Sequence, residues 1–119
     1  MTPIYEIAHT EPKKVKFDWV SDGDGNASAT THSKHSGSVC CVSIVHDKQF
    51  PPIAAYDVYV YNDDGGDILC GEGKDIAPVV DKILTREACA LGSLADSKLS
   101  FNISGAGGAG KKGSITVYL

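Results

Sequence analysis

The sequence predicts an all-β protein: an antiparallel β-sandwich, jelly-roll or Ig-like, with at most one short helix near residues 75–85. Two observations lead to this prediction. Short runs of alternating apolar and polar residues recur along the chain, as in strands with one buried face. Thirteen glycines, together with frequent Val, Ile, Thr, Ser and Tyr, indicate short strands joined by many turns.

The whole chain, residues 1–119, is predicted to form a single β-sandwich domain. Half of this length would be too short to bury a core of its own. A hydrophobic content of 42% and a charged content of 22% fit a folded globular chain. Residues 1–12 are expected to form an extended N-terminal segment of this domain.

The first half of the chain contains three predicted strands. Residues 14–19 alternate between polar and apolar, which predicts a strand with one face in water. The Asp, Gly and Asn residues at 22–26 predict a turn, and a polar strand is expected to follow at 27–31. Residues 38–46 are apolar on both sides, as in a strand at the centre of a sandwich.

Residues 55–61 are a second candidate for a central strand. Alternation divides the side chains between two faces, with Tyr56, Val58 and Val60 on one and Asp57, Tyr59 and Tyr61 on the other. The Asn-Asp-Asp-Gly-Gly run at 62–66 predicts a turn, and residues 67–70 are expected to return as a short strand.

One segment has the period of a helix. Its apolar residues recur three and four positions apart, at Ile76, Val79, Val80, Ile83 and Leu84. Asp75 is a suitable N-cap, and Pro78 is compatible with a first helical turn. These signals predict one short helix or helical turn of about ten residues.

The C-terminal region nearly contains a phosphate-binding P-loop. Gly105, Gly110 and Lys111 have the spacing of GxxxxGK[ST], but Lys112 stands where the magnesium-binding Ser or Thr belongs. The few residues that follow leave no room for the helix whose N-terminus would hold the phosphates. The motif is therefore interpreted as a glycine-rich connection between strands.

The strands on either side of that connection are predicted to pair as a hairpin. Leu99, Phe101 and Ile103 alternate with polar residues, and residues 115–119 repeat the same pattern. Antiparallel pairing of these two runs would place both apolar sets on one face of the hairpin.

Charge and targeting signals exclude several classes of partner. The net charge of −4 argues against nucleic acid, which requires a basic face. The chain has no apolar run of the roughly 20 residues that span a bilayer and no secretory signal, so folding in the cytosol is expected. The four cysteines are therefore expected to be reduced and buried, with a Cys70–Cys89 disulfide as the alternative.

A calcium site is the strongest metal hypothesis. Asp22, Asp24 and Asn26 match the start of a calcium loop, but Ala27 and Ser33 stand where such a loop has Gly and Glu. We interpret these residues as a turn and predict no metal site, with a calcium- or ligand-binding β-sandwich as an alternative function.

The remaining polar motifs give no catalytic set. His32 and His35 would share a zinc ion on a helix, whereas the Ser and Thr around them indicate a loop. No Ser or Cys is accompanied by a recognisable base and orienting group. His9 and His46 are interpreted as surface or strand-end residues. We predict no enzymatic activity and no cofactor.

Three groups of residues are candidate partner contacts. Two are apolar segments, one at the N-terminus and one in a proline-rich loop, and the third is a pair of tyrosines opposite the apolar face of their strand. The candidates are Pro3, Ile4, Tyr5, Ile7, Phe50, Pro51, Pro52, Ile53, Tyr59 and Tyr61.

Residues 56–69 read YDVYVYNDDGGDIL, and residues 99–118 read LSFNISGAGGAGKKGSITVY. In this order the two stretches resemble small virion proteins of tailed bacteriophages. In those proteins a strand–turn–strand beginning YDV precedes an AG-x-G-x-x-G connection between two β-prone runs. The resemblance covers roughly half of the chain and leaves out residues 13–19 and 75–84.

The resemblance implies a head cement or decoration protein on the outer surface of a tailed-phage capsid. Its implied partners are the major capsid protein and copies of itself, as a dimer or trimer, with no nucleic acid and no membrane. Its implied location is the virion capsid surface, after assembly in the host cytoplasm. A tail adaptor or fibre-associated β-sandwich module is the alternative within the virion.

Overall fold

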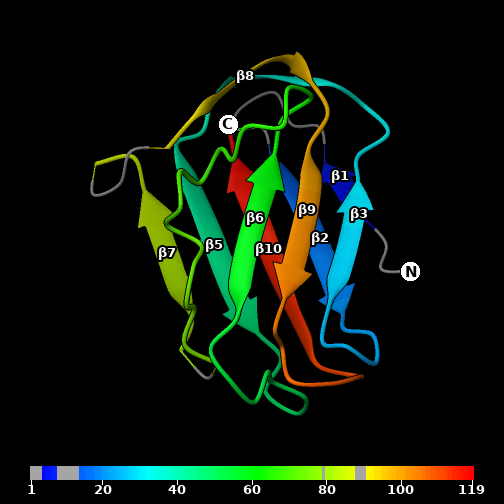
Figure 1. Ribbon diagram of the computed structural model, residues 1–119. Coiled ribbons are helices and arrows are strands. Elements are labelled where there is room, and N and C mark those ends of the chain that lie inside the picture. The colour runs from blue at the N-terminus through cyan, green and yellow to red at the C-terminus, as the bar shows by residue number, and fades with distance from the viewer. Residues whose placement is uncertain (1–3, 8–13, 79, 88–90) are drawn as a thin grey trace.

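Short antiparallel strands build the whole fold (Figure 1). The computed structural model describes residues 4–7, 14–78, 80–87 and 91–119, with side chains from residue 14 onward. Its strands are β1 (Ile4–Ile7), β2 (Lys14–Val20), β3 (Ala27–Thr30), β4 (His35–Ser38), β5 (Cys41–His46), β6 (Asp57–Tyr61), β7 (Lys82–Thr85), β8 (Ser93–Ser97), β9 (Ser100–Ser104) and β10 (Lys112–Tyr118). The prediction of an all-β sandwich is confirmed.

The strands form two packed layers and a small cap. The order β1-β2-β10-β5-β7 makes a five-stranded sheet, and β3-β9-β6 makes a three-stranded sheet in front of it (Figure 1). The pair β4-β8 crosses one end of the sandwich. From β2 onward, the strands of the two large sheets alternate between these sheets along the chain. This alternation is the wrapping of a jelly roll.

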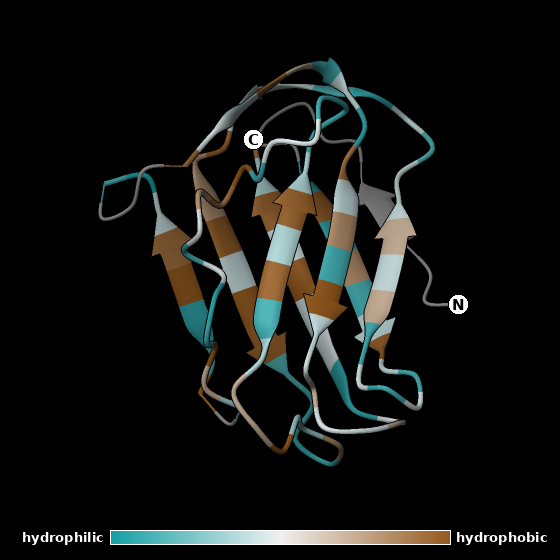
Figure 2. Ribbon diagram, in the orientation of Figure 1, coloured by the Kyte–Doolittle hydropathy of each residue, from teal (hydrophilic) through white to brown (hydrophobic). Residues whose placement is uncertain are grey.

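The core lies between the two large sheets and follows the alternation of the sequence (Figure 2). Val15, Phe17 and Trp19 of β2 are fully or almost fully buried. Phe17 meets Phe101 of β9 across the core, with ring centroids 5.1 Å apart. Tilted aromatic contacts of this kind stabilise a core beyond the area that they bury.

The predicted helix near residues 75–85 is wrong, because no helix occurs among the described residues. Ile76 forms a bridge with Tyr56, and β7 pairs with β5. The apolar side chains of this segment also do not share one face, since Leu84 is buried while Ile83 is 66% exposed. Pairing with the sheet therefore overrides the helical period.

The predicted hairpin of residues 99–104 and 115–119 is also wrong. Strand β9 pairs with β3 and β6, whereas β10 pairs with β2 and β5. The glycine-rich connection therefore crosses from one sheet to the other. The apolar residues of both strands are still buried, but they face each other across the core rather than lying on one surface.

Two smaller predictions on the segment after residue 55 need correction. Strand β6 is an edge strand of its sheet, not a central one. Residues 67–70 do not return as a strand, because only Asp67 bridges to Tyr61 and turns follow it. The segment up to Ile76 covers the edge of β6, and Gly73 accepts a hydrogen bond from the Val58 N–H there.

The cysteines are less buried than expected. Cys40 and Cys70 are exposed, Cys41 is half-buried, and all three are free thiols. Cys89, and with it the Cys70–Cys89 alternative, lies outside the described residues. In the described part of the chain, no helix has the length and apolar character needed to cross a membrane.

Candidate functional site

Three loops from distant parts of the sequence meet at the end of the sandwich opposite the β4-β8 cap. They are residues 21–26, 47–55 and 105–111, and we call them together the loop end. The Ile53 N–H donates to the Ala106 carbonyl, and the Ala106 N–H donates to the Gly25 carbonyl. The glycine-rich loop therefore lies between the other two loops and joins them.

The glycines of this loop allow a very close approach. A Cβ atom on Gly107 would lie 2.2 Å from Cγ1 of Ile53, and one on Gly25 would lie 2.8 Å from the Gly107 nitrogen. Both residues also have positive φ angles, 90° and 79°, which favour glycine. The run that resembles a P-loop is thus a packing element, and its Gly107 leaves room for Ile53 to lie directly against the loop.

Phe50 is held at the loop end by local hydrogen bonds. The Asp47 carboxylate accepts the N–H groups of Gln49 and Phe50, which closes a side-chain-capped turn. The Phe50 carbonyl accepts the Lys112 N–H at 2.7 Å, and the Lys112 ammonium lies 5.2 Å from the Phe50 ring centroid. These contacts fix an aromatic ring that is 44% exposed.

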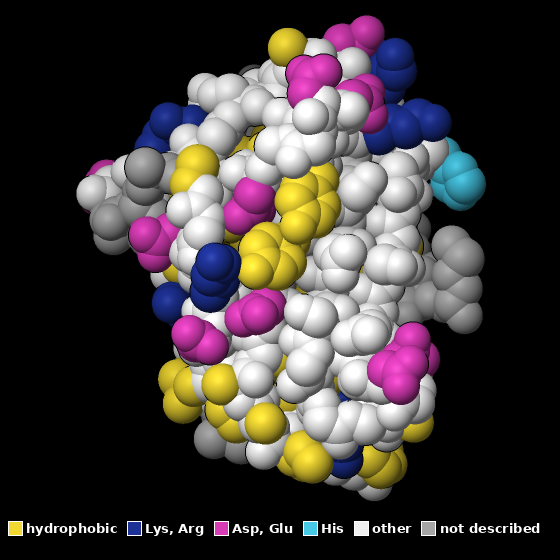
Figure 3. Space-filling view, in the orientation of Figure 1, with side chains coloured by type: hydrophobic (Ala, Val, Ile, Leu, Met, Phe, Trp, Pro, Cys, Tyr) yellow, Lys and Arg dark blue, Asp and Glu magenta, His cyan; other side chains and the backbone are white. Residues whose placement is uncertain are grey.

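Exposed apolar side chains concentrate at this end of the molecule, where Figure 3 shows hydrophobic atoms gathered below the strands. Six large hydrophobic residues are exposed in the described part of the chain, and only Ile83 belongs to another region, the outer face of β7. The other five lie in the loop end or beside it: Val20, Val45, Phe50, Ile53 and Val80.

A shallow groove continues this surface onto the outer face of the five-stranded sheet. Its volume is about 430 Å³, and Val20 and Val45 line it together with Asp18, Lys112 and Ser114. Asp18, Ser114 and Val45 are cross-strand partners, so their side chains share the face opposite the core. The loop end and this groove form one apolar surface with polar edges.

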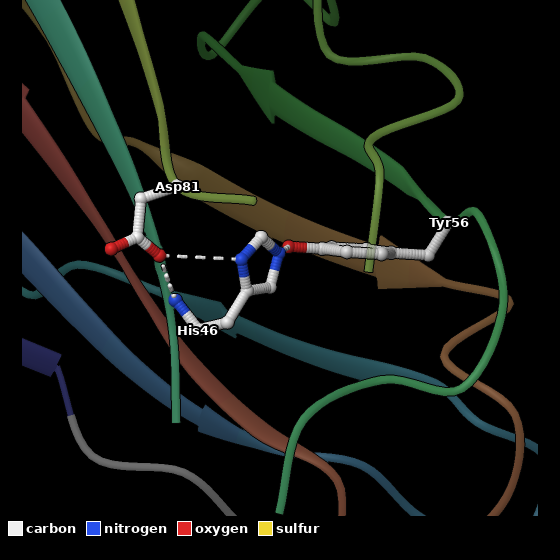
Figure 4. A network of polar contacts seen from close by, with 3 residues as sticks. All are labelled: His46, Tyr56 and Asp81. Carbon is white, nitrogen blue, oxygen red and sulfur yellow. Dashed lines mark hydrogen bonds and ion pairs between the residues drawn. The ribbon is translucent and has the colours of Figure 1, made fainter. Parts of the chain in front are cut away.

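A polar network of two buried side chains and one exposed carboxylate, that of Asp81, lies beside the loop end (Figure 4). The Tyr56 hydroxyl lies 2.6 Å from Nε2 of His46, and Nδ1 of His46 lies 3.4 Å from Oδ1 of Asp81. The same Asp81 oxygen accepts the His46 backbone N–H at 2.9 Å. His46 ends β5 and Tyr56 precedes β6, so the network ties the two sheets together.

Acid, imidazole and hydroxyl stand here in the order of a catalytic triad, but the burial of the imidazole and the hydroxyl favours a structural role. Tyr56 is 1% exposed, and burial raises the pKa of its hydroxyl well above the usual range, with Asp81 acting in the same direction. Burial lowers the pKa of His46, against the opposing effect of Asp81. His46 is the last residue of β5, as the strand-end interpretation has it, but it does not lie at the surface, since it is 8% exposed.

No sequence pattern identified this network. His46 ends β5 and Tyr56, ten residues later, precedes β6 of the other sheet, while Asp81 lies in the segment for which the sequence predicts a helix. The one available signal was that a polar side chain, His46 or Tyr56, takes an inward position in an otherwise apolar run of residues.

The predicted partner contacts fall into separate places. Pro3 lies outside the described residues, and Ile4, Tyr5 and Ile7 form part of the edge strand β1. Phe50 and Ile53 are exposed at the loop end, Pro51 is half-buried and Pro52 is buried. Tyr59 and Tyr61 lie on the outer face of β6.

The candidate metal ligands are not brought together. The Asp22 Oδ1 atom accepts the N–H groups of Asp24 and Asn26, which closes the predicted turn. His32 is exposed in a bend, while His35 belongs to β4. Within residues 14–78, 80–87 and 91–119, no group of three His, Cys, Asp or Glu side chains is placed to hold a metal ion.

Comparison with known proteins gives little guidance. No protein-family model and no curated protein matches this chain. Among solved structures, an exo-β-1,3-galactanase from Phanerochaete chrysosporium is similar at 16% identity and a TM-score of 0.39 over 99% of this chain. The capsular polysaccharide assembling protein CapF from Staphylococcus aureus is similar at 6% identity and a TM-score of 0.22 over 98% of the chain. This chain spans 29% and 30% of those proteins, and neither similarity is strong enough to carry an argument.

Proposed function

We propose that this protein is a structural component of a tailed-phage virion that binds the outer surface of the head as a cement or decoration protein. The concentration of exposed apolar side chains at the loop end carries the proposal. A monomer gains nothing by holding Phe50 and Ile53 in water, whereas a protein interface buries such side chains at its centre.

Contacts within the loop end restrain Phe50 and Ile53. Ile53 is packed against Gly107, and Phe50 is fixed by the Asp47 carboxylate. Side chains that are already ordered lose little conformational entropy on binding, so more of the contact energy appears as affinity. Repetition of such contacts over a symmetric shell would give firm attachment from individually weak sites.

A role in binding rather than catalysis is part of the same proposal. The triad-like group of His46, Tyr56 and Asp81 has its hydroxyl closed off from solvent, so no substrate atom has access to it. The sequence resemblance to small virion proteins adds support, and its second stretch includes the glycine-rich loop of the loop end.

Quantitative mass spectrometry of purified virions tests the proposal. A head protein should be present in hundreds of copies per particle, since it repeats with the capsid lattice. Six or twelve copies would instead indicate the tail adaptor alternative, and absence from mature particles would overturn both. Calorimetry with calcium adds a further check, and we expect no binding, because no group of three His, Cys, Asp or Glu side chains in the described part of the chain is placed to hold an ion.

A further inference from the structure

Tyr59 and Tyr61 form an aromatic platform on the outer face of the three-stranded sheet. Their ring planes differ by 10°, and their centroids lie 5.7 Å apart. Both side chains are half-buried, and Figure 3 shows the hydrophobic patch over β6 open to solvent and separate from the loop end. Two parallel rings at this spacing match consecutive residues of an extended chain of six-membered sugar rings.

On the side of β9 and β3, the neighbours of the two rings are uncharged hydrogen-bonding groups. Tyr59 is the cross-strand partner of Asn102, and Asn102 is the partner of Ser28. Tyr61 is paired in the same way with Ser100 and then Thr30, whose hydroxyls lie 3.0 Å apart. Amide and hydroxyl groups both donate and accept hydrogen bonds, which suits a ligand that carries many hydroxyls.

We propose that this platform binds a neutral oligosaccharide, with pyranose rings stacked on Tyr59 and Tyr61. The C–H faces of a sugar ring pack on an aromatic face, and its hydroxyls would bond to Asn102, Ser28 and the Ser100–Thr30 pair. Such a combination of a few apolar contacts with placed polar groups is how small-molecule sites gain both affinity and orientation.

The charge around the platform selects a neutral ligand. The strand segment and edge loop over residues 57–75 contain one lysine and six carboxylates: Asp57, Asp63, Asp64, Asp67, Glu72 and Asp75. This field repels sulfated glycans, uronic acids and nucleic acids. None of the exposed large hydrophobic side chains of the described residues lies on this face, so its apolar patch is small.

The inference goes beyond the proposed virion function and uses a different surface. A fluorescently labelled full-length protein on an array of neutral and anionic glycans tests it, followed by titration calorimetry with the strongest neutral oligosaccharide. Y59A and Y61A should each weaken binding by about tenfold, and the double variant should abolish it. Y118A, which removes a half-buried tyrosine from the five-stranded sheet, is the matched control and should bind like the wild type.

Saturation-transfer NMR on the wild type gives a second readout that needs no variant. Irradiation of the tyrosine ring protons should transfer saturation to the sugar C–H protons. The proposal is overturned if no neutral glycan binds, if only anionic glycans bind, or if the folded double variant binds as well as the wild type. An F50S/I53S variant should keep glycan binding. The glycan result can therefore be interpreted even if the virion proposal fails.

Discussion

The loop end and the tyrosine platform are both exposed, but they are built in opposite ways. At the loop end, Phe50 and Ile53 project from irregular backbone that is held by glycine packing and by the network of His46 beside it. On the platform, Tyr59 and Tyr61 project from a regular strand with hydroxyl and amide neighbours. The first suits a large apolar partner, and the second suits a small polar one.

The tyrosines of residues 56–61 make the same contrast within one segment. Tyr56 points inward and closes the polar network, while Tyr59 and Tyr61 point outward. The residue type is the same, so the difference in role comes only from the two-residue period of the strand.

Substitution of the inner tyrosine should have the largest effect on stability. Y56A removes a buried ring that packs on Trp19, with centroids 5.6 Å apart, and should cost about 3–5 kcal/mol in the free energy of unfolding. Y56F keeps the ring but leaves His46 without its hydroxyl partner, at a cost of about 1–3 kcal/mol. Urea denaturation measures both values.

The outer tyrosine provides the control for that pair. Y61A should cost less than about 1 kcal/mol, because its ring is only half-buried. Equal losses from Y56A and Y61A would contradict the assignment of a structural role to the inner tyrosine alone.

The next largest effect should come from the glycine-rich loop. G107A places a Cβ atom against Ile53 at a φ of +90° and should destabilise the protein by about 1–3 kcal/mol. G110A has a similar φ of +76° but open space around its Cβ, so it reports backbone strain alone. If the two variants melt at the same temperature, close packing does not hold Ile53 in place.

The smallest expected effect is the pH dependence of the His46 network. The pKa of His46 is lower in the folded state, so the unfolded chain takes up the proton first as the pH falls. Its contribution to stability is therefore complete above about pH 6.5, the usual pKa of histidine, and declines below it. H46Q should lose this component of the pH dependence, which thermal melts of both proteins between pH 7.5 and 5 would measure. An unchanged slope would contradict the role given to His46.

Strand faces could be predicted from the sequence, but the pairing of strands could not. Alternation placed Val58 and Val60 inside and Tyr59 and Tyr61 outside, as the structure has them. The same alternation is satisfied whether β9 and β10 pair with each other or face each other across the core. Alternation alone therefore does not distinguish a hairpin from a connection between two sheets.

The functional surface was predictable only in part. Phe50 and Ile53 stood out as apolar residues in a proline-rich loop. The contacts around these two residues could not be predicted, because they join distant segments of the chain. Gly107 lies against Ile53, and His46 beside the loop end is bonded to Asp81. The helical spacing at residues 76–84 predicts a helix, but pairing of β7 with the distant strand β5 decides the conformation there.

The most direct test of the central claim is attachment to phage heads. Purified heads stripped of this protein would be incubated with wild type, F50S/I53S or Y59A/Y61A, and the bound copies would be counted after sedimentation. We predict that the wild type and Y59A/Y61A rebind alike, while F50S/I53S stays in the supernatant although it remains folded. Rebinding of F50S/I53S at the wild-type level would contradict the claim that the loop end is the docking surface.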